Sequence, residues 1–333
     1  MNIYNFEADY QRRGILPRPQ LPALPPRRRG GESLEDPENR VAWRLRADDA
    51  LPIIDSHCHL DMLFRDERVR GQRSFRRYQA DHGFPTPAGF AGAISNWCWP
   101  TLMDTAEGIL AGDNRLWGTF GCHPHWVAEY DLRLHARIAD SISAFPPAVA
   151  WGEMGLDYAH RYRFRPDRQR QKEVFRSQLR TASRMGLPVV IHCREAEADV
   201  FKILKTFLRR DHDIHYHCVT VGPEALSPVI QRFPRARFGF TNLIYNNDAR
   251  GRAAQATARA LPLDRILAET DAPFHPPPSW KSDPESRCNP KRRAVSHPGM
   301  AGEVLKKIAE VKDLPYSEVA RQVYQNTCQL YRL

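Results

Sequence analysis

Short apolar runs alternate with longer amphipathic stretches along the chain from residue 51 onward. The apolar runs predict eight strands, at residues 51–55, 91–97, 116–121, 148–152, 187–192, 213–217, 236–240 and 265–270. Apolar positions at helical spacing predict helices between and after them, at residues 101–111, 129–144, 168–185, 195–209, 223–232, 248–260, 298–311 and 316–330. This alternation matches an α/β fold, the (β/α)8 TIM barrel.

An open, doubly wound sheet is the alternative α/β architecture. It commonly carries a Gly-x-Gly-x-x-Gly fingerprint after a strand, and no predicted strand here is followed by one. The clearest helix is 168–185, and Gly186 and Pro188 predict where it ends. We therefore expect a single catalytic barrel domain at residues 51–333.

Residues 1–50 differ from the rest of the chain in composition and in the pattern of apolar positions. Prolines space an Arg-Arg-Arg-Gly-Gly tract, and no apolar period is sustained. This composition is typical of extended or disordered linkers. The segment is predicted to be a flexible Pro/Arg-rich N-terminal extension.

The composition indicates where in the cell the protein is located, and it argues against two kinds of small scaffold. Of 333 residues, 42% are hydrophobic and 26% are charged, as in an ordinary globular protein. No apolar run approaches the ~20 residues of a membrane span, and no basic region followed by an apolar stretch opens the chain. The seven cysteines form no Cys-x-x-Cys pair, which argues against a disulfide framework and a thiolate zinc cluster. We expect an intracellular protein, cytoplasmic or nuclear, that is neither secreted nor membrane-bound.

The formal net charge is +10, which favours an anionic partner such as nucleic acid. Most of the excess lies in residues 51–333, because residues 1–50 hold nine Arg against eight Asp and Glu. Basic and aromatic residues gather after three predicted strands: Arg65, Arg68, Arg70, Arg73, Arg76 and Arg77; Tyr158, Arg161, Tyr162, Arg163, Phe164 and Arg165; Trp280, Lys281, Arg287, Lys291, Arg292 and Arg293. Such a pattern is typical of a groove for single-stranded nucleic acid, although part of it also suits solvated faces. No feature indicates an obligate protein partner.

Residues that commonly bind metals recur at the ends of predicted strands. His57 and His59 follow the first strand and can reach one ion together. Four more lie at the ends of later strands: Glu153, His192, His217 and Asp271. Each taken singly also suits a structural hydrogen bond or a helix cap. The strand ends of a barrel meet at one mouth, so we expect all six to lie together.

Four imidazoles and two carboxylates exceed the needs of one tetrahedral site, and they predict two divalent ions that share a carboxylate. Mg, Mn and Zn suit such donors, depending on the substrate. A serine or cysteine nucleophile is disfavoured, because no Gly-x-Ser-x-Gly elbow is present and Cys58, Cys193 and Cys218 are expected to point away from the mouth. Arg194, close to His192, is the best candidate for a phosphate contact.

The motifs resemble those of the TatD family of metal-dependent deoxyribonucleases, within the amidohydrolase superfamily. They are Asp-Ser-His-Cys-His-Leu-Asp at 55–61, Gly-Cys-His-Pro-His at 121–125, Gly-Glu-Met-Gly-Leu-Asp-Tyr at 152–158, Leu-Pro-Val-Val-Ile-His-Cys-Arg-Glu-Ala at 187–196, His-Cys at 217–218, Glu-Thr-Asp-Ala-Pro-Phe at 269–274 and Asn-Thr-x-x-Leu-Tyr at 326–331. They follow the family's order from about residue 51 to residue 333. The resemblance implies a TIM barrel and nuclease activity.

The resemblance also implies roles for individual residues. It makes His57 and His59 ligands of a first metal, Glu153 a bridging and catalytic carboxylate, and Asp271 a first-metal ligand that also handles protons. It makes His192 and His217 ligands of the second metal and places His123 near the substrate. His125 and His215 match no ligand position of the family, and we interpret them as structural.

The predicted function is metal-dependent hydrolysis of phosphodiester bonds in DNA, RNA or both, as an exonuclease on single-stranded ends. Two other functions stay open at this point. One is an aminoacyl-tRNA deacylase or small-molecule amidohydrolase that uses the same metal centre. The other, disfavoured by the intact ligand set, is a nucleic-acid-binding protein without catalysis.

Overall fold

Eight parallel strands form one sheet in which each strand pairs with the next along the chain, in the order β1 to β8. The computed structural model describes residues 51–65, 74–82, 89–159, 167–278 and 295–333. The strands are β1 (Ile53–Cys58), β2 (Phe90–Trp97), β3 (Leu116–Phe120), β4 (Ala148–Asp157), β5 (Val189–Arg194), β6 (Ile214–Tyr216), β7 (Ala236–Phe240) and β8 (Ile266–Ala268). All eight predicted strands are present, and the (β/α)8 barrel is confirmed.

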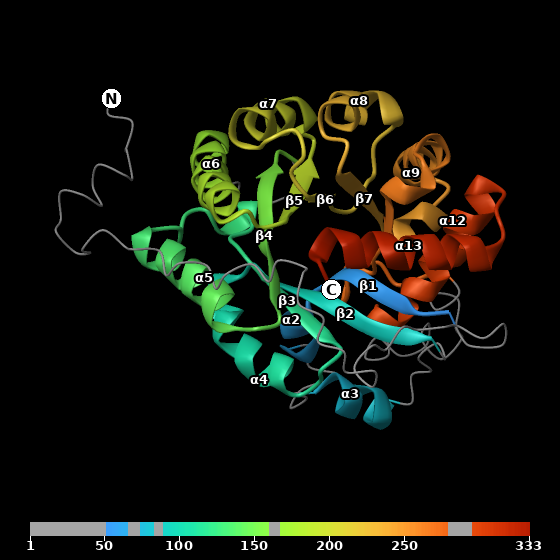
Figure 1. Ribbon diagram of the computed structural model, residues 1–333, viewed down its shortest axis with the longest axis horizontal. Helices are drawn as coiled ribbons and strands as arrows, with labels where there is room; N and C mark the ends of the chain where they lie inside the picture. Colours follow the sequence, from blue (N-terminus) through green and yellow to red (C-terminus); the bar gives the residue numbers. More distant parts are fainter. Residues whose placement is uncertain (1–50, 66–73, 83–88, 160–166, 279–294) are drawn as a thin grey trace, which may run out of the picture. The chain divides into compact units, whose positions relative to one another are not determined.

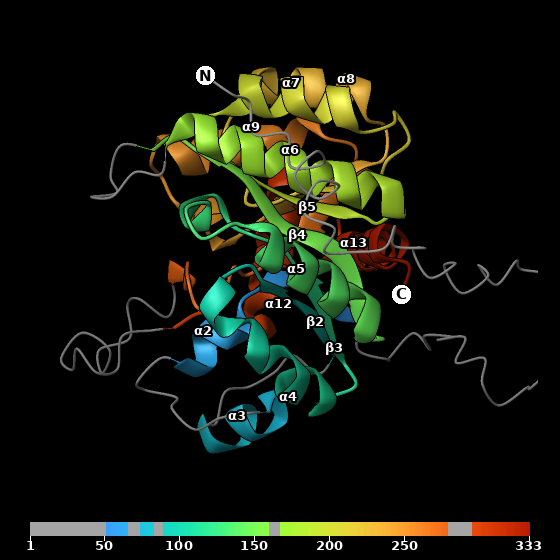
Figure 2. The ribbon, with the colours of Figure 1, turned by 90° about the vertical axis from the view of Figure 1, so that its left-hand side faces the viewer.

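Helices surround the strands (Figure 1). The α-helices are α2 (Leu60–Arg65), α3 (Phe75–His82), α4 (Ala106–Ala111), α5 (Leu132–Ala144), α6 (Arg168–Met185), α7 (Glu197–Phe207), α8 (Pro223–Arg232), α9 (Ala249–Ala260), α12 (Ala301–Lys312) and α13 (Tyr316–Tyr331). Short 3-10 turns are η1 (Pro100–Thr105), η2 (Pro124–Trp126), η3 (Asn242–Tyr245), η4 (Leu263–Arg265) and η6 (Pro298–Met300). Helices α6, α7 and α8 lie outside β4 and β5 in Figure 2. Among the described residues, no helix has the length and apolar character needed to cross a membrane.

The barrel is closed between β8 and β1 by hydrogen bonds at the carboxyl ends of these strands. Asp271 N donates to His57 O at 2.9 Å, and His59 N donates to Ala272 O at 2.7 Å. The buried Asp55 accepts from Thr270 N at 2.9 Å and from Thr270 Oγ1 at 2.5 Å. The same closure therefore holds three of the predicted ligands beside each other.

Helix α13 packs at the opposite end of the strands, beside β1 (Figure 1). Its residues Leu330 and Tyr331 join one buried cluster with residues near the amino ends of the strands. The strand members of that cluster are Ile54, Ile94, Ala150, Val190 and Leu267. The helix thus covers the end of the barrel that lies away from the ligands.

Local signals explain where the clearest helix begins and ends. The Asp167 side chain accepts hydrogen bonds from Gln169 N and Arg170 N at the start of α6, which satisfies amide groups that have no partner within the helix. At its end Gly186 has φ 65°, a left-handed conformation that favours glycine. The predicted bounds 168–185 are confirmed.

Several predicted bounds are corrected by the structure. The strand predicted at 148–152 continues to Asp157, and the one predicted at 187–192 begins at Val189 and continues to Arg194. Glu153 and His192 therefore lie within strands rather than at their ends. The helix predicted at 101–111 is the turn η1 followed by α4. The short helices α2 and α3 were not predicted. The predicted extension at residues 1–50 lies outside the described residues.

Candidate metal centre

Four predicted ligands come together where β1, β4 and β8 approach one another. The Nε2 atoms of His57 and His59 are 3.2 Å apart. Glu153 Oε2 lies 3.5 Å from each of these nitrogens, and Asp271 Oδ1 lies 3.7 Å from His57 Nε2 and 3.3 Å from His59 Nε2. Donor atoms about 2.0–2.2 Å from one tetrahedral ion lie roughly 3.4 Å from each other. These four side chains are therefore spaced like the ligands of a single ion.

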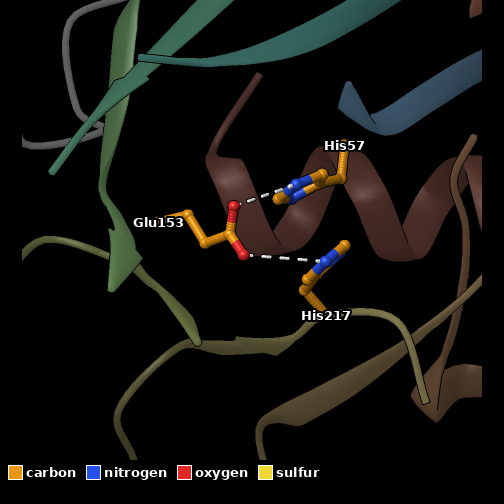
Figure 3. Close-up of side chains that lie close together, drawn as sticks. All are labelled: His57, Glu153 and His217. Atoms are coloured by element: carbon orange, nitrogen blue, oxygen red, sulfur yellow. Dashed lines mark ion pairs between the residues drawn. The ribbon is translucent and has the colours of Figure 1, made fainter. Parts of the chain in front are cut away.

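A second group faces the other oxygen of the same glutamate. Glu153 Oε1 lies 2.7 Å from His192 Nδ1 and 3.7 Å from the Nε2 atoms of His217 and His123. Figure 3 shows His57 and His217 on the two oxygens of this carboxylate. The structure thus brings the other five predicted ligands, and His123, together with Glu153. A carboxylate with donors on both oxygens fits the centre of a two-metal site.

Burial and neighbouring charges set the ionisation of the centre. Glu153 is 2% exposed and His57 is fully buried. Burial alone would raise the pKa of Glu153, but His217 and His123 hold that pKa well below its ordinary value. Burial, with a further contribution from His217, lowers the pKa of His57 to about 4. A carboxylate anion and a neutral imidazole are the forms that bind a cation.

Asp271 joins the buried centre to a more exposed side chain. Burial works against its ionisation, yet His217, His275 and His59 hold the pKa of Asp271 well below its ordinary value. Its Oδ1 faces the paired histidines, whereas its Oδ2 lies 3.4 Å from His275 Nε2. The side chain of His275 is 29% exposed. Asp271 therefore contacts both the buried pair of histidines and the partly exposed His275.

Contacts to the far side of the ligand rings orient them. The Nδ1 atom of His59 lies 3.0 Å from Asn96 O, which leaves its Nε2 directed to the centre. His217 Nδ1 lies 3.0 Å from Glu269 Oε1, on a glutamate that is fully buried. Such outer contacts fix the tautomer and the angle of a ligating imidazole.

His125 and His215 contact carboxylates that touch the ligands. His125 Nε2 lies 2.8 Å from Asp157 Oδ2, which is 3.4 Å from His192 Nε2. His215 Nε2 lies 2.7 Å from Glu269 Oε2, on the opposite side of that carboxylate from His217. We interpreted both histidines as structural, and the available signal was their spacing, because each stands two residues from another histidine of the site.

Two buried cysteines differ in their contacts: Cys58 packs away from the candidate metal centre, whereas Cys98 contacts it. Cys58 Sγ donates to Ile94 O at 3.4 Å, and Cys58 is fully buried, so it packs away from the centre as predicted. Cys98 was not singled out, yet its Sγ donates to Glu153 Oε2 at 3.7 Å. No motif marks Cys98, because only the folded barrel brings it to Glu153.

The predicted substrate contacts are described in part. His123 lies beside the centre, and Arg194 ends β5 in register with Asp157. Arg76 is exposed and lies 3.5 Å from Asp113, and Arg77 is also exposed. Most of the predicted basic residues, at positions 66–73, 160–166 and 279–294, lie outside the described residues.

Comparisons with known proteins agree with this geometry. Two solved structures share the fold: a TatD homologue of Escherichia coli, with a TM-score of 0.66, 22% identity and coverage of 84% of this chain and 98% of that one, and a TatD family hydrolase of Entamoeba histolytica, with a TM-score of 0.68, 17% identity and coverage of 85% and 98%. At these identities the likeness shows the fold alone.

Sequence relatives are more informative. A 3'-5' RNA nuclease of Homo sapiens is 36% identical over 312 residues, which are 93% of this chain and 38% of that protein. A 3'-5' ssDNA/RNA exonuclease of Erwinia tasmaniensis is 32% identical over 221 residues, 65% of this chain and 78% of that protein. The chain thus spans well under half the length of the human relative. The family model described as TatD related DNase matches residues 54–332, and the chain belongs to this family of metal-dependent hydrolases.

Proposed function

We propose that this protein is a metal-dependent nuclease that hydrolyses phosphodiester bonds of DNA or RNA, as an exonuclease on single-stranded ends. The observation that carries the proposal is Glu153, whose two oxygens each face a separate group of histidines. Because the human and Erwinia relatives are both named 3'-5' nucleases, we propose the same polarity here.

Two divalent ions fit the donors present. His57, His59, Asp271 and Glu153 Oε2 would hold one ion, and His192, His217 and Glu153 Oε1 would hold the other. Imidazole and carboxylate donors suit Zn, Mn or Mg. When bound, such a pair activates a water and supplies positive charge at the phosphoryl oxygens.

The chain's own residues would complete the reaction. Asp271 is ionised and lies next to His275, so it can accept the proton of the attacking water and pass it toward solvent. His123 lies 3.7 Å from Glu153 Oε1 and 3.3 Å from His192 Nδ1, and this position beside the donors supports a contact with the scissile phosphate. Arg194 would contact a phosphate at the mouth of the barrel.

The decisive experiment digests end-labelled single-stranded DNA and RNA side by side, with Mg, Mn or Zn. The protein should shorten the labelled DNA, the labelled RNA or both from the 3' end, and it should do so only when a divalent metal is present. Glu153→Ala and His192→Ala should abolish the activity, because each removes a donor at the centre. Glu173→Gln, at an exposed position of α6, is the matched control and should retain it. Full activity in both centre variants would overturn the mechanism.

Adding aminoacyl esters and amides to the same set of substrates separates the other two functions. Turnover of aminoacyl esters or amides with intact nucleic acid would assign the centre to a deacylase or amidohydrolase. Salt-dependent binding of nucleic acid with no turnover under any metal would indicate a binding protein.

A further inference from the structure

The thiol of Cys98 stands at the metal centre, although no motif marks it. Cys98 directly follows β2, so it lies at the same strand edge as the ligands. The residue is fully buried. Its Sγ donates to Glu153 Oε2 at 3.7 Å, and Sγ, a ring nitrogen of His59 and an oxygen of Glu153 all lie within 4.8 Å of one another.

Cys98 contacts one particular oxygen of Glu153, namely Oε2. Glu153 Oε2 is the oxygen that faces His57 and His59, while Oε1 faces His192 and His217. Cys98 therefore joins the first group of donors and not the second. In contrast, the buried thiols of Cys58 and Cys122 donate to the backbone carbonyls of Ile94 and His123.

We propose that Cys98 Sγ is a further donor to the ion held by His57, His59, Glu153 and Asp271, and that it biases this position toward zinc and other thiophilic ions. The inference rests on the metal centre of the proposed function. Sulfur donors select zinc and related soft ions over Mg, and Cys98 Sγ lies beside the same Glu153 oxygen that faces His57 and His59. On coordination the thiol would release its proton to water.

The alternative is that the thiol only orients Glu153 by a hydrogen bond. Burial, together with the Glu153 carboxylate, raises the pKa of Cys98 to about 12, so the thiol is uncharged when no cation is near it. A neutral thiol would support the carboxylate equally well whichever divalent ion is bound. A sulfur ligand can be distinguished from such a hydrogen bond because only the ligand gives a charge-transfer band between thiolate and metal.

The test uses the full chain, stripped of metal and then loaded with Cd²⁺ or Co²⁺. A sulfur ligand gives an ultraviolet charge-transfer band from thiolate to metal, which we expect in the unaltered protein. Cys98→Ser and Cys98→Ala should lose the band, with folding checked by circular dichroism. Cys122→Ser is the matched control, because it removes another buried thiol, and it should retain the band. A band that persists in Cys98→Ser, or that is missing from the unaltered protein, overturns the proposal.

Affinity provides a second measurement. Calorimetric titration should show that Cys98→Ser lowers the affinity for Zn²⁺ at least about tenfold, the lower end of the effect of losing a supporting contact, while the affinity for Mg²⁺ is unchanged. Equal losses for both ions would contradict the bias toward zinc.

Failure of the inference can be told apart from failure of the proposed function. Elemental analysis of the loaded protein counts bound ions whatever their ligands. Bound ions and metal-dependent nuclease activity without the band would refute the sulfur ligand alone. Protein that binds no ion and digests no nucleic acid would refute both.

Discussion

Single residues outside the predicted ligands contact the side chains that hold those ligands, and His215 is the clearest of them. Glu269 lies between His215 Nε2, at 2.7 Å, and His217 Nδ1, at 3.0 Å. Burial alone would raise the pKa of Glu269, but His217 and His215 hold it below its ordinary value. On its other side, His215 Nδ1 lies 2.6 Å from Tyr331 Oη in α13. We therefore expect His215 to position His217 through Glu269.

His215→Leu should weaken metal binding by about 10–100-fold, because Glu269 Oε2 loses its partner and no longer orients His217. The measurement is calorimetric titration with Zn²⁺ or Mn²⁺. His215→Gln keeps a hydrogen-bond donor and should restore part of the affinity.

His135→Leu serves as the control for a lost histidine hydrogen bond, since His135 contacts Tyr130 and Thr181 away from the centre. It should lower stability without lowering metal affinity. Unchanged affinity in His215→Leu would show that Glu269 is held without this histidine.

At the scale of elements, the turn into β3 depends on a charged contact. Asp113 is 2% exposed and accepts from Arg115 N at 3.1 Å, Nε at 3.0 Å and Nη2 at 2.7 Å. Burial alone would raise the pKa of Asp113, but the hydrogen bonds from Arg115 lower it below its ordinary value. The carboxylate thus stabilises the folded state above its ordinary pKa, and this contribution is lost as pH falls through the lowered folded-state pKa.

Asp113→Asn should therefore lower the free energy of unfolding at neutral pH by about 1–3 kcal/mol, as for hydrogen bonds to a charged group. The difference from the unaltered protein should shrink as pH falls into the acidic range. Chemical denaturation at a series of pH values measures it. Asp211→Asn, which removes an exposed pair with Arg209, should leave the free energy unchanged. A pH-independent loss in Asp113→Asn would assign the effect to packing rather than charge.

Long elements could be predicted from their periodicity, and short ones could not. Helix α6 has eighteen residues and capping signals at both ends, so its bounds follow from the sequence. Helix α3 has eight residues and buries Phe75 and Tyr78, which is too little for a reliable period.

The true end of β4 depends on its neighbour. Its ladder with β5 continues through the pair Gly155 and His192. A Cβ at Gly155 would lie 1.9 Å from His192 O, so the close approach admits only glycine. A pairing of this kind between residues far apart in the chain leaves no periodic signal within β4.

In the candidate site, too, some residues could be predicted from the sequence and others depend on contacts between distant parts of the chain. The six predicted ligands could be found because the carboxyl-terminal parts of the strands, and the residues that follow them, converge in any such barrel. The contacts of Glu269, Cys98 and His215 could not be assigned from position alone. Each acts through a contact to a residue on another strand, and such contacts exist only once the barrel is closed.

At the scale of the whole molecule, the centre joins residues in or after five of the eight strands. Its predicted donors lie in β1, β4 and β5 and in the residues after β1, β6 and β8. Burying several carboxylates and imidazoles without a cation is costly. Bound ions would therefore stabilise the fold itself as well as supply chemistry, because the unfolded chain does not hold the donors together.

Removal of metal by a chelator should therefore lower the melting temperature of the protein, and reloading should restore it. At a free ion concentration about 100 times the dissociation constant, one site adds about 2.7 kcal/mol to the free energy of unfolding. Glu153→Gln should lose most of this increment, because it removes the charge that both groups of donors share, while the exposed Glu173→Gln should keep it. The increment is measured by thermal and chemical unfolding with and without ions. Equal stability of the stripped and loaded unaltered protein would show that the donors do not hold an ion in the folded barrel.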